Sequence, residues 1–204
     1  MIYMIGGVPR VGKTHLVQKV VTRKPMHAVS SDALRYMMRH ALPHDALPQE
    51  FFLPTLADKP MDPNVALALQ NAESTALWPA IIEFGKSYVE DDTDLLIEGV
   101  AVVPELLVTD CPYPVRAIIL SNASPSHEQA VIGQAQSNPN DWMHKYSLEI
   151  QQRLASFFTF MDADLRAQAA MHGIDLVEVH DETFDQDLER AADLLLKELP
   201  PQNT

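Results

Sequence analysis

The sequence has little cysteine and little positive charge, and it has no long apolar run. Its one cysteine, Cys111, cannot form an internal disulfide or a cysteine-rich zinc site. No apolar stretch approaches the roughly 18 residues of a membrane-spanning helix, and no basic, cleavable leader is recognisable at the N-terminus. The eight histidines show no H-E-x-x-H zinc spacing. These features exclude a disulfide scaffold and an integral membrane protein, and they favour a cytoplasmic protein.

Basic residues are scarce and unevenly distributed. The chain has 15 Lys and Arg against 28 Asp and Glu, and its net charge of −13 argues against broad binding of nucleic acids or anionic membranes. Residues 1–40 nevertheless carry a net charge of +6, whereas the remaining chain carries −19. This asymmetry indicates a local anion site, although a solvated helix face is the plainer alternative.

A glycine-rich motif lies within that basic region. Met1–Ile5 is a short apolar run typical of a strand buried on both faces, and apolar residues at helical spacing follow Lys13. Between them the chain reads G-x-x-x-x-G-K-T, the phosphate-binding loop, in which backbone N–H groups surround phosphate oxygens. Lys13 would reach the β- and γ-phosphates of a nucleotide, and the Thr14 hydroxyl would ligate Mg²⁺. The predicted nucleotide-binding residues are Gly7, Val8, Pro9, Arg10, Val11, Gly12, Lys13 and Thr14. A tight glycine turn with a surface lysine is the alternative.

A second motif, H-A-V-S-S-D-A-L-R, predicts a strand followed by a helix that begins near Ser30 or Ser31. On that helix Asp32, Arg35 and Arg39 lie within about 60° of one another by angular spacing. Two arginines at this spacing repel each other unless an anion sits between them. The alternative is a simple ion pair between Asp32 and Arg35.

With these two motifs the chain resembles the P-loop small-molecule kinases of the adenylate-kinase type, and among them the 2-phosphoglycerate-kinase-like members. The resemblance implies that Asp32 meets the acceptor, that Arg35 holds its anionic group and that Arg39 assists. It also implies a role for Glu98 in the sequence Ile-Glu-Gly, at the end of a predicted third strand. Glu98 would organise Mg²⁺ through water, or it would be the second candidate, after Asp32, for the base that deprotonates the acceptor. The alternative is that Glu98 only pairs with a nearby lysine.

The rest of the chain predicts a three-layer α/β fold of the P-loop NTPase type, in one domain over residues 1–199 with a tail at 200–204. Strands alternate with helices, which indicates a parallel sheet with helices on both faces. The resemblance implies the strand order 2-3-1-4-5. We also expect a helix over about 64–89, a helix or broken pair over 141–172, and a last helix over about 184–199. Thr183 and Gln186 fit a capping box for that last helix.

Two segments are expected to cover the site. Residues 41–63 contain five prolines and predict a loop or short-helix excursion over the acceptor. Residues 121–145 predict a polar lid, which in the resembling kinases supplies arginines to the transferred phosphate. From 121 to 152 this chain has no arginine and one lysine, Lys145, so we expect that charge to come from Lys13 and Mg²⁺, from Arg116 or Arg153, or from a partner. For Arg153 a solvated helix face is the alternative.

The leading hypothesis is therefore an ATP- and Mg²⁺-dependent kinase of a small, anionic acceptor, with Lys13, Asp32 and Glu98 as catalytic residues. The arginine-poor lid leaves open a nucleotide-binding switch or slow NTPase that acts through a protein partner. A third hypothesis is a kinase of an antibiotic or of a cell-wall sugar nucleotide.

Overall fold

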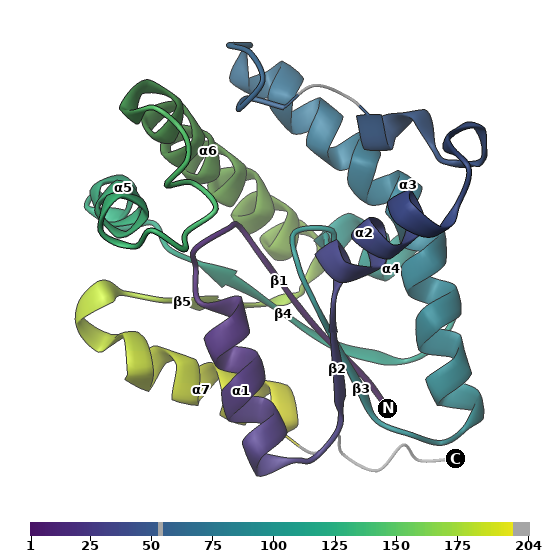
Figure 1. Ribbon diagram of the computed structural model, residues 1–204. Coiled ribbons are helices and arrows are strands. Elements are labelled where there is room, and N and C mark those ends of the chain that lie inside the picture. The colour runs from purple at the N-terminus through teal and green to yellow at the C-terminus, as the bar shows by residue number, and fades with distance from the viewer. Residues whose placement is uncertain (53–54, 198–204) are drawn as a thin grey trace.

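A five-stranded parallel sheet forms the centre of the protein, in a computed structural model that describes residues 1–52 and 55–197 (Figure 1). The strand order β2-β3-β1-β4-β5 confirms the predicted order. The predicted tail and the predicted end of the last helix at Leu199 lie outside the described residues. The strands are β1 (Ile2–Gly7), β2 (His27–Ser30), β3 (Leu95–Glu98), β4 (Val115–Ser121) and β5 (Asp175–Glu178).

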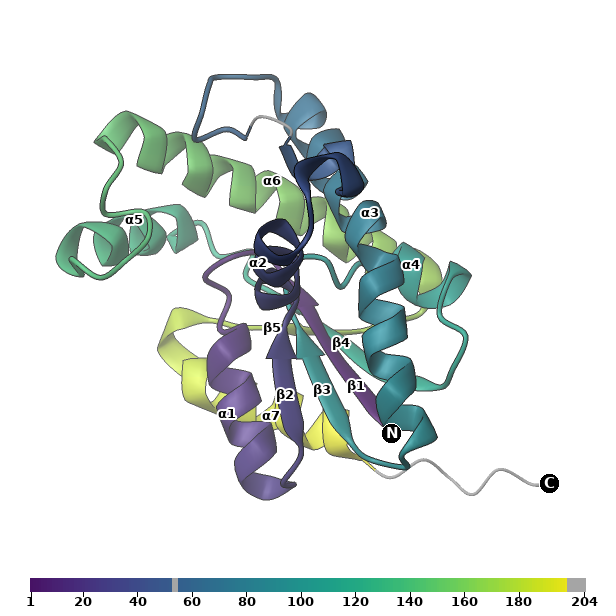
Figure 2. The ribbon, with the colours of Figure 1, turned by 45° about the vertical axis from the view of Figure 1, so that its right-hand side comes forward.

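Helices cover both faces of the sheet, which explains why its central strands are continuous apolar runs. Ile2, Met4 and Ile5 of β1 and Leu95, Leu96 and Ile97 of β3 are completely buried. Two helices, α1 and α7, pack against each other beneath one face, while α3, α4 and α6 cover the other (Figures 1 and 2). Their bounds are α1 (Lys13–Arg23), α3 (Pro63–Glu90), α4 (Pro104–Thr109), α6 (Leu148–His172) and α7 (Phe184–Leu196).

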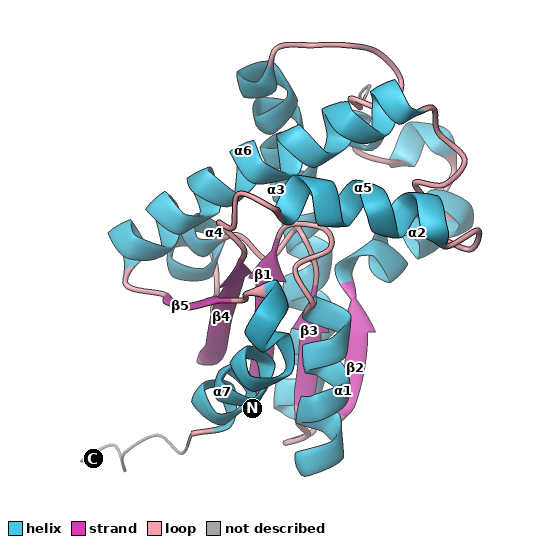
Figure 3. Ribbon diagram, turned by 90° about the vertical axis from the view of Figure 1, so that its left-hand side faces the viewer, coloured by secondary structure: helices cyan, strands magenta, loops and turns pink. Residues whose placement is uncertain are grey.

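The remaining elements lie above the carboxyl ends of the strands, where the loops of a parallel sheet gather (Figure 3). The segment predicted as an excursion contains two short 3₁₀ turns and leads from α2 to α3. The segment predicted as a lid contains one helix, α5, which packs against α6. These elements are α2 (Ser31–Ala41), η1 (His44–Ala46), η2 (Gln49–Phe52) and α5 (His127–Ser137).

Side-chain hydrogen bonds mark the start of three of these helices, α2, α3 and α6, and they correct one prediction. The Ser30 side chain accepts from the Asp32 N–H at the start of α2, as predicted, and Ser147 caps α6 in the same way. The capping box of Thr183 and Gln186 is wrong, because Thr183 makes no capping bond. Its hydroxyl instead donates to the buried Asp187 carboxylate (2.8 Å), which also accepts from the His180 backbone N–H (3.0 Å).

No helix in the described part of the chain is long and apolar enough to cross a membrane.

A further 3₁₀ turn, η3 (Asp181–Thr183), joins β5 to α7.

Gly99, directly after β3, is predicted to be required for the fold. Its φ is +150°, and an added Cβ would lie 1.8 Å from the Oγ of Ser31, the first residue of α2. Gly99→Ala should therefore lower the free energy of unfolding by about 2 kcal/mol or more. Urea denaturation measures this.

Gly133 provides the matched control, because an added Cβ there meets no atom within 4 Å. It lies inside α5, so Gly133→Ala should raise the free energy of unfolding by about 0.5–1 kcal/mol. Equal effects of the two substitutions would contradict the role assigned to Gly99.

Candidate active site

One cleft of about 1430 Å³ lies at the carboxyl ends of the strands. The loop after β1 contributes one group of the residues that line it. A second group of lining residues comes from α2, α3 and the predicted excursion at 41–63, and a third comes from α5, α6 and η3. All the polar side chains predicted to act in catalysis or acceptor binding line it, namely Lys13, Asp32, Glu98, Arg35 and Arg39. Pro9, Arg10, Gly12 and Thr14 of the predicted phosphate-binding loop line it as well.

The loop between β1 and α1 follows a path that only glycine permits at two points. Gly7 has a φ of +136°, and a Cβ there would lie 2.5 Å from the Leu120 carbonyl oxygen of β4. Gly12 has a φ of +101° and immediately precedes α1, and a Cβ there would lie 3.0 Å from the ring of Phe184. The loop therefore fits tightly between β4 and α7, with the N-terminus of α1 directed at the cleft. A helix N-terminus of this kind attracts anions.

Lys13 is almost completely buried at the first turn of α1. Its Nζ donates to the carbonyl oxygens of Gly7 (2.9 Å) and Val8 (2.8 Å), so the side chain curls back over the loop. Burial lowers the pKa of Lys13 to about 8, against the opposing influence of the nearby Glu98 and Asp32 carboxylates. The ammonium group thus lies at the centre of the predicted site, with its charge poorly solvated.

Glu98 occupies the end of β3, where it pairs in register with Ile5 of β1 and Ser30 of β2. Burial raises the pKa of Glu98, while the Lys13 ammonium and a hydrogen bond from the Ser30 side chain lower it. The carboxylate is therefore half-buried near Lys13 of the predicted phosphate-binding loop.

The oxygen ligands around the loop suit Mg²⁺, although they do not enclose it. Thr14 contributes a hydroxyl to the cleft, and Asp32 and Glu98 contribute carboxylates. Among the described residues no group of three or more His, Cys, Asp or Glu could hold a metal ion. Mg²⁺ commonly binds through one or two protein oxygens together with substrate phosphates, and this set of ligands fits that arrangement.

Arg35 is held by carboxylates on two sides. Its Nη2 lies 3.2 Å from Asp32 Oδ1, which is the ion pair that the sequence left open as an alternative. Its Nη1 donates to Glu73 Oε1 on α3 (2.8 Å), and Glu73 also lines the cleft. Glu73 could not be predicted as a site residue, because it is an isolated acid in a long apolar-rich helix.

The structure does not bring Arg116 or Arg153 to the cleft. Arg116 pairs in register with Tyr3 near the amino end of the sheet and donates to the Leu194 carbonyl oxygen (3.4 Å). Arg153 pairs with Glu149 (3.8 Å) one turn away on α6, and neither arginine lines the cleft. The prediction that either of them replaces the lid arginines is therefore wrong for Arg116 and unsupported for Arg153.

His127, at the start of α5, was missed by sequence analysis. It lines the cleft and is 5% exposed, and both of its ring nitrogens are buried without a hydrogen-bond partner in the described structure. Burial lowers its pKa, against the influence of Asp181, Asp162 and Glu128. No spacing pattern in the sequence distinguishes it from the other histidines.

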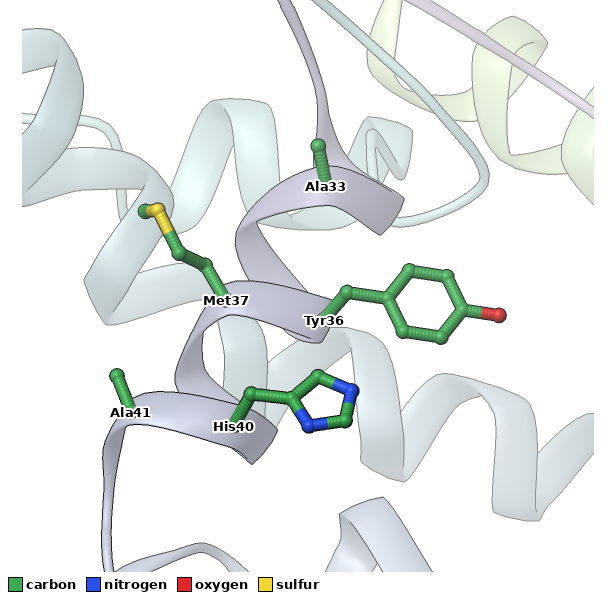
Figure 4. A pocket seen from close by; sticks show the side chains of 5 residues that line it. All are labelled: Ala33, Tyr36, Met37, His40 and Ala41. Carbon is green, nitrogen blue, oxygen red and sulfur yellow. The ribbon is translucent and has the colours of Figure 1, made fainter.

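A second, shallower hollow lies on the outer face of α2 (Figure 4). It is lined by Ala33, Tyr36, Met37, His40 and Ala41, and Met37 is 60% exposed. Of the residues predicted to act, none lines this hollow.

Comparison with known proteins supports the fold. No protein-family model matches the chain, and no curated protein sequence matches it. Among solved structures, shikimate kinase from Bacteroides thetaiotaomicron is similar with a TM-score of 0.53 and 12% identity, over 96% of this chain and 98% of that one. Dephospho-CoA kinase from Campylobacter jejuni aligns with a TM-score of 0.46 and 11% identity, over 95% and 96% of the two chains. The likeness to the shikimate kinase, together with the strand order, shows the three-layer fold of P-loop kinases.

The pKa of Lys13 predicts how nucleotide binding depends on pH. Polyphosphate near the ammonium would raise this pKa above about 8, so binding would take up a proton at higher pH. The affinity for MgADP should therefore fall as the pH rises from 8 to 9.5, approaching a tenfold loss per pH unit. Titration calorimetry in buffers of different ionisation enthalpy measures the affinity and the proton uptake. Because arginine stays charged over this pH range, Lys13→Arg should remove most of the pH dependence of MgADP affinity. The same pH dependence in Lys13→Arg as in the wild-type chain would contradict the assignment of this titration to Lys13.

Proposed function

We propose that the protein is a kinase that transfers the γ-phosphate of ATP to a hydroxyl group of a small acceptor, with Mg²⁺ as cofactor. The observation that carries this proposal is the meeting of Lys13, Asp32 and Glu98 in the cleft. The charges of both carboxylates act on the Lys13 ammonium, although Lys13 follows β1, Asp32 follows β2 and Glu98 ends β3. The fold shared with the shikimate kinase supports the proposal.

In this reaction the loop N–H groups and Lys13 hold the β- and γ-phosphates. Asp32, whose side chain is 52% exposed, accepts the proton of the acceptor hydroxyl. The hydroxyl oxygen forms a bond to the γ-phosphorus while the bond to the β,γ-bridging oxygen breaks, and ADP leaves. Mg²⁺, held by Thr14 and through water by Glu98, would neutralise charge on the phosphates. Catalysis would then consist mainly of positioning and charge neutralisation.

The acceptor is proposed to bind between α2 and α3, where Arg35 and Arg39 face the cleft. An anionic group on the acceptor must compete with Glu73 and Asp32 for the Arg35 guanidinium. Apolar side chains also line this side of the cleft, so the acceptor would combine a polar head with an apolar part. These include Phe51, Leu56, Met61 and Leu69.

A second function, slow NTP hydrolysis coupled to a protein partner, is favoured by one observation. The lid and the start of α6 contain no arginine from 121 to 152, so the transferred phosphate lacks the usual source of positive charge.

Label transfer from γ-labelled ATP separates these functions. With Mg²⁺ and a panel of nucleoside monophosphates, phosphoglycerates, sugars and aminoglycosides, we expect one acceptor class to become labelled. Asp32→Asn should lower the rate of transfer at least about 100-fold with little change in nucleotide affinity, because it removes the base and not the phosphate site. Slow phosphate release that ignores every acceptor would instead support the NTPase.

Arg35 and its partner test the anionic acceptor. Arg35→Ala should weaken binding of an anionic acceptor by about 1.5–3 kcal/mol, the value of a charged hydrogen bond. Glu73→Gln should strengthen it, since one competing carboxylate is removed from Arg35. Acceptor constants measured by calorimetry provide the test, and unchanged constants in both variants would remove Arg35 from the acceptor site.

A further inference from the structure

Arg10 occupies an unusual place in the phosphate-binding loop. Its φ is +73°, in the left-handed region that residues with a side chain rarely adopt. Such a conformation persists only where the surrounding structure holds it, and it often marks a functional position. The Arg10 side chain lines the cleft beside Lys13 and Thr14.

The guanidinium of Arg10 contacts the far end of the lid. Its Nη2 forms an ion pair with Oδ1 of Asp141, and the guanidinium carbon lies 5.9 Å from the centre of the Trp142 ring. Asp141 is 131 residues away in the sequence, in the turn between α5 and α6. Arg10 therefore links the predicted phosphate-binding loop to the lid.

The ion pair is buried but incompletely satisfied. The Asp141 side chain is completely buried, and its Oδ1 also accepts from the Met143 N–H (2.7 Å). Its Oδ2 and the Nε of Arg10 are both buried without a hydrogen-bond partner in the described structure. A buried charge that lacks part of its hydrogen bonding is costly, so this arrangement is easily exchanged for a better one.

A nucleotide polyphosphate offers Arg10 such a partner. It carries more negative charge than one carboxylate, and arginine binds phosphate oxygens through two parallel hydrogen bonds. Arg10 belongs to the loop that would surround those phosphates, and the cleft extends directly beside it.

We propose that Arg10 is a phosphate-binding residue of the transfer site, which Asp141 holds at the lid and releases when MgATP binds. This inference rests on the proposed function and extends it. Arg10 would supply, from the loop itself, the guanidinium charge that the arginine-poor lid does not provide. Asp141 and Trp142 are then positioning residues, because they act through Arg10 and link the lid to nucleotide binding.

Calorimetry with the chain of residues 1–204 tests the exchange of partners, with AMP, MgADP and a non-hydrolysable MgATP analogue as probes. Arg10→Ala should weaken binding of the triphosphate by roughly 10-fold or more and leave AMP nearly unchanged. Asp141→Asn should strengthen triphosphate binding by roughly 3- to 10-fold, because Arg10 is released from its carboxylate. In the Arg10→Ala background, Asp141→Asn should have no such effect.

If Arg10→Ala folds poorly, Arg10→Lys and a control variant still test the role of Arg10. Arg10→Lys retains the charge without the paired hydrogen bonds and should bind the triphosphate with intermediate affinity. Glu149→Gln, which breaks the Arg153–Glu149 pair on α6, is the matched control and should not change nucleotide affinity.

A purely structural ion pair gives a different pattern. Asp141→Asn would then lower the melting temperature and weaken or leave unchanged the binding of all three probes, which would overturn the inference. If the wild-type chain binds MgATP through Lys13 and Asp141→Asn has no effect, the inference alone fails. If no nucleotide binds to the wild-type chain, the proposed function fails with it.

Discussion

The turn between β1 and α1 is the constraint on which the site depends. Gly7 passes so close to the Leu120 carbonyl oxygen that no Cβ fits there, and Gly12 combines a φ of +101° with a close approach to the Phe184 ring. This fit fixes the loop between β4 and α7 and directs the N-terminus of α1 into the cleft. Because the sheet is parallel, the ends of β2 and β3 bring Asp32 and Glu98 to the same edge.

Negative charge balances the cations of this cleft. Lys13 is surrounded by carbonyl oxygens and lies near two carboxylates, Arg35 lies between Asp32 and Glu73, and Arg10 contacts Asp141. An anionic substrate would therefore exchange protein carboxylates for phosphate or acceptor oxygens instead of filling an open positive pocket. On a protein of net charge −13, this arrangement favours anions that make several specific contacts over those that carry charge alone.

Local sequence signals predicted the helices and strands well. The predictions that failed did so because of contacts between residues that are distant in the sequence. The buried strands, the glycine turn and the Ser30 cap follow from residues that are close in sequence. The capping box at Thr183 failed because a buried carboxylate, Asp187, competes for its hydroxyl. The prediction that Arg116 replaces the lid arginines failed because Arg116 lies near the amino end of β4, away from the cleft, although it is close to the lid in the sequence.

The sequence by itself determined the glycine-rich turn with Lys13 and the alternation of strands and helices, since these depend on short-range backbone geometry or periodicity; Asp32 and Glu98 became candidates only through the resemblance to P-loop kinases. The tertiary structure alone decided the partners of the charged side chains. Glu73 lies 38 residues from Arg35, and Asp141 lies 131 residues from Arg10. Such pairs form because folding buries charges that must then find a counter-ion nearby, and sequence spacing carries no record of which one is near.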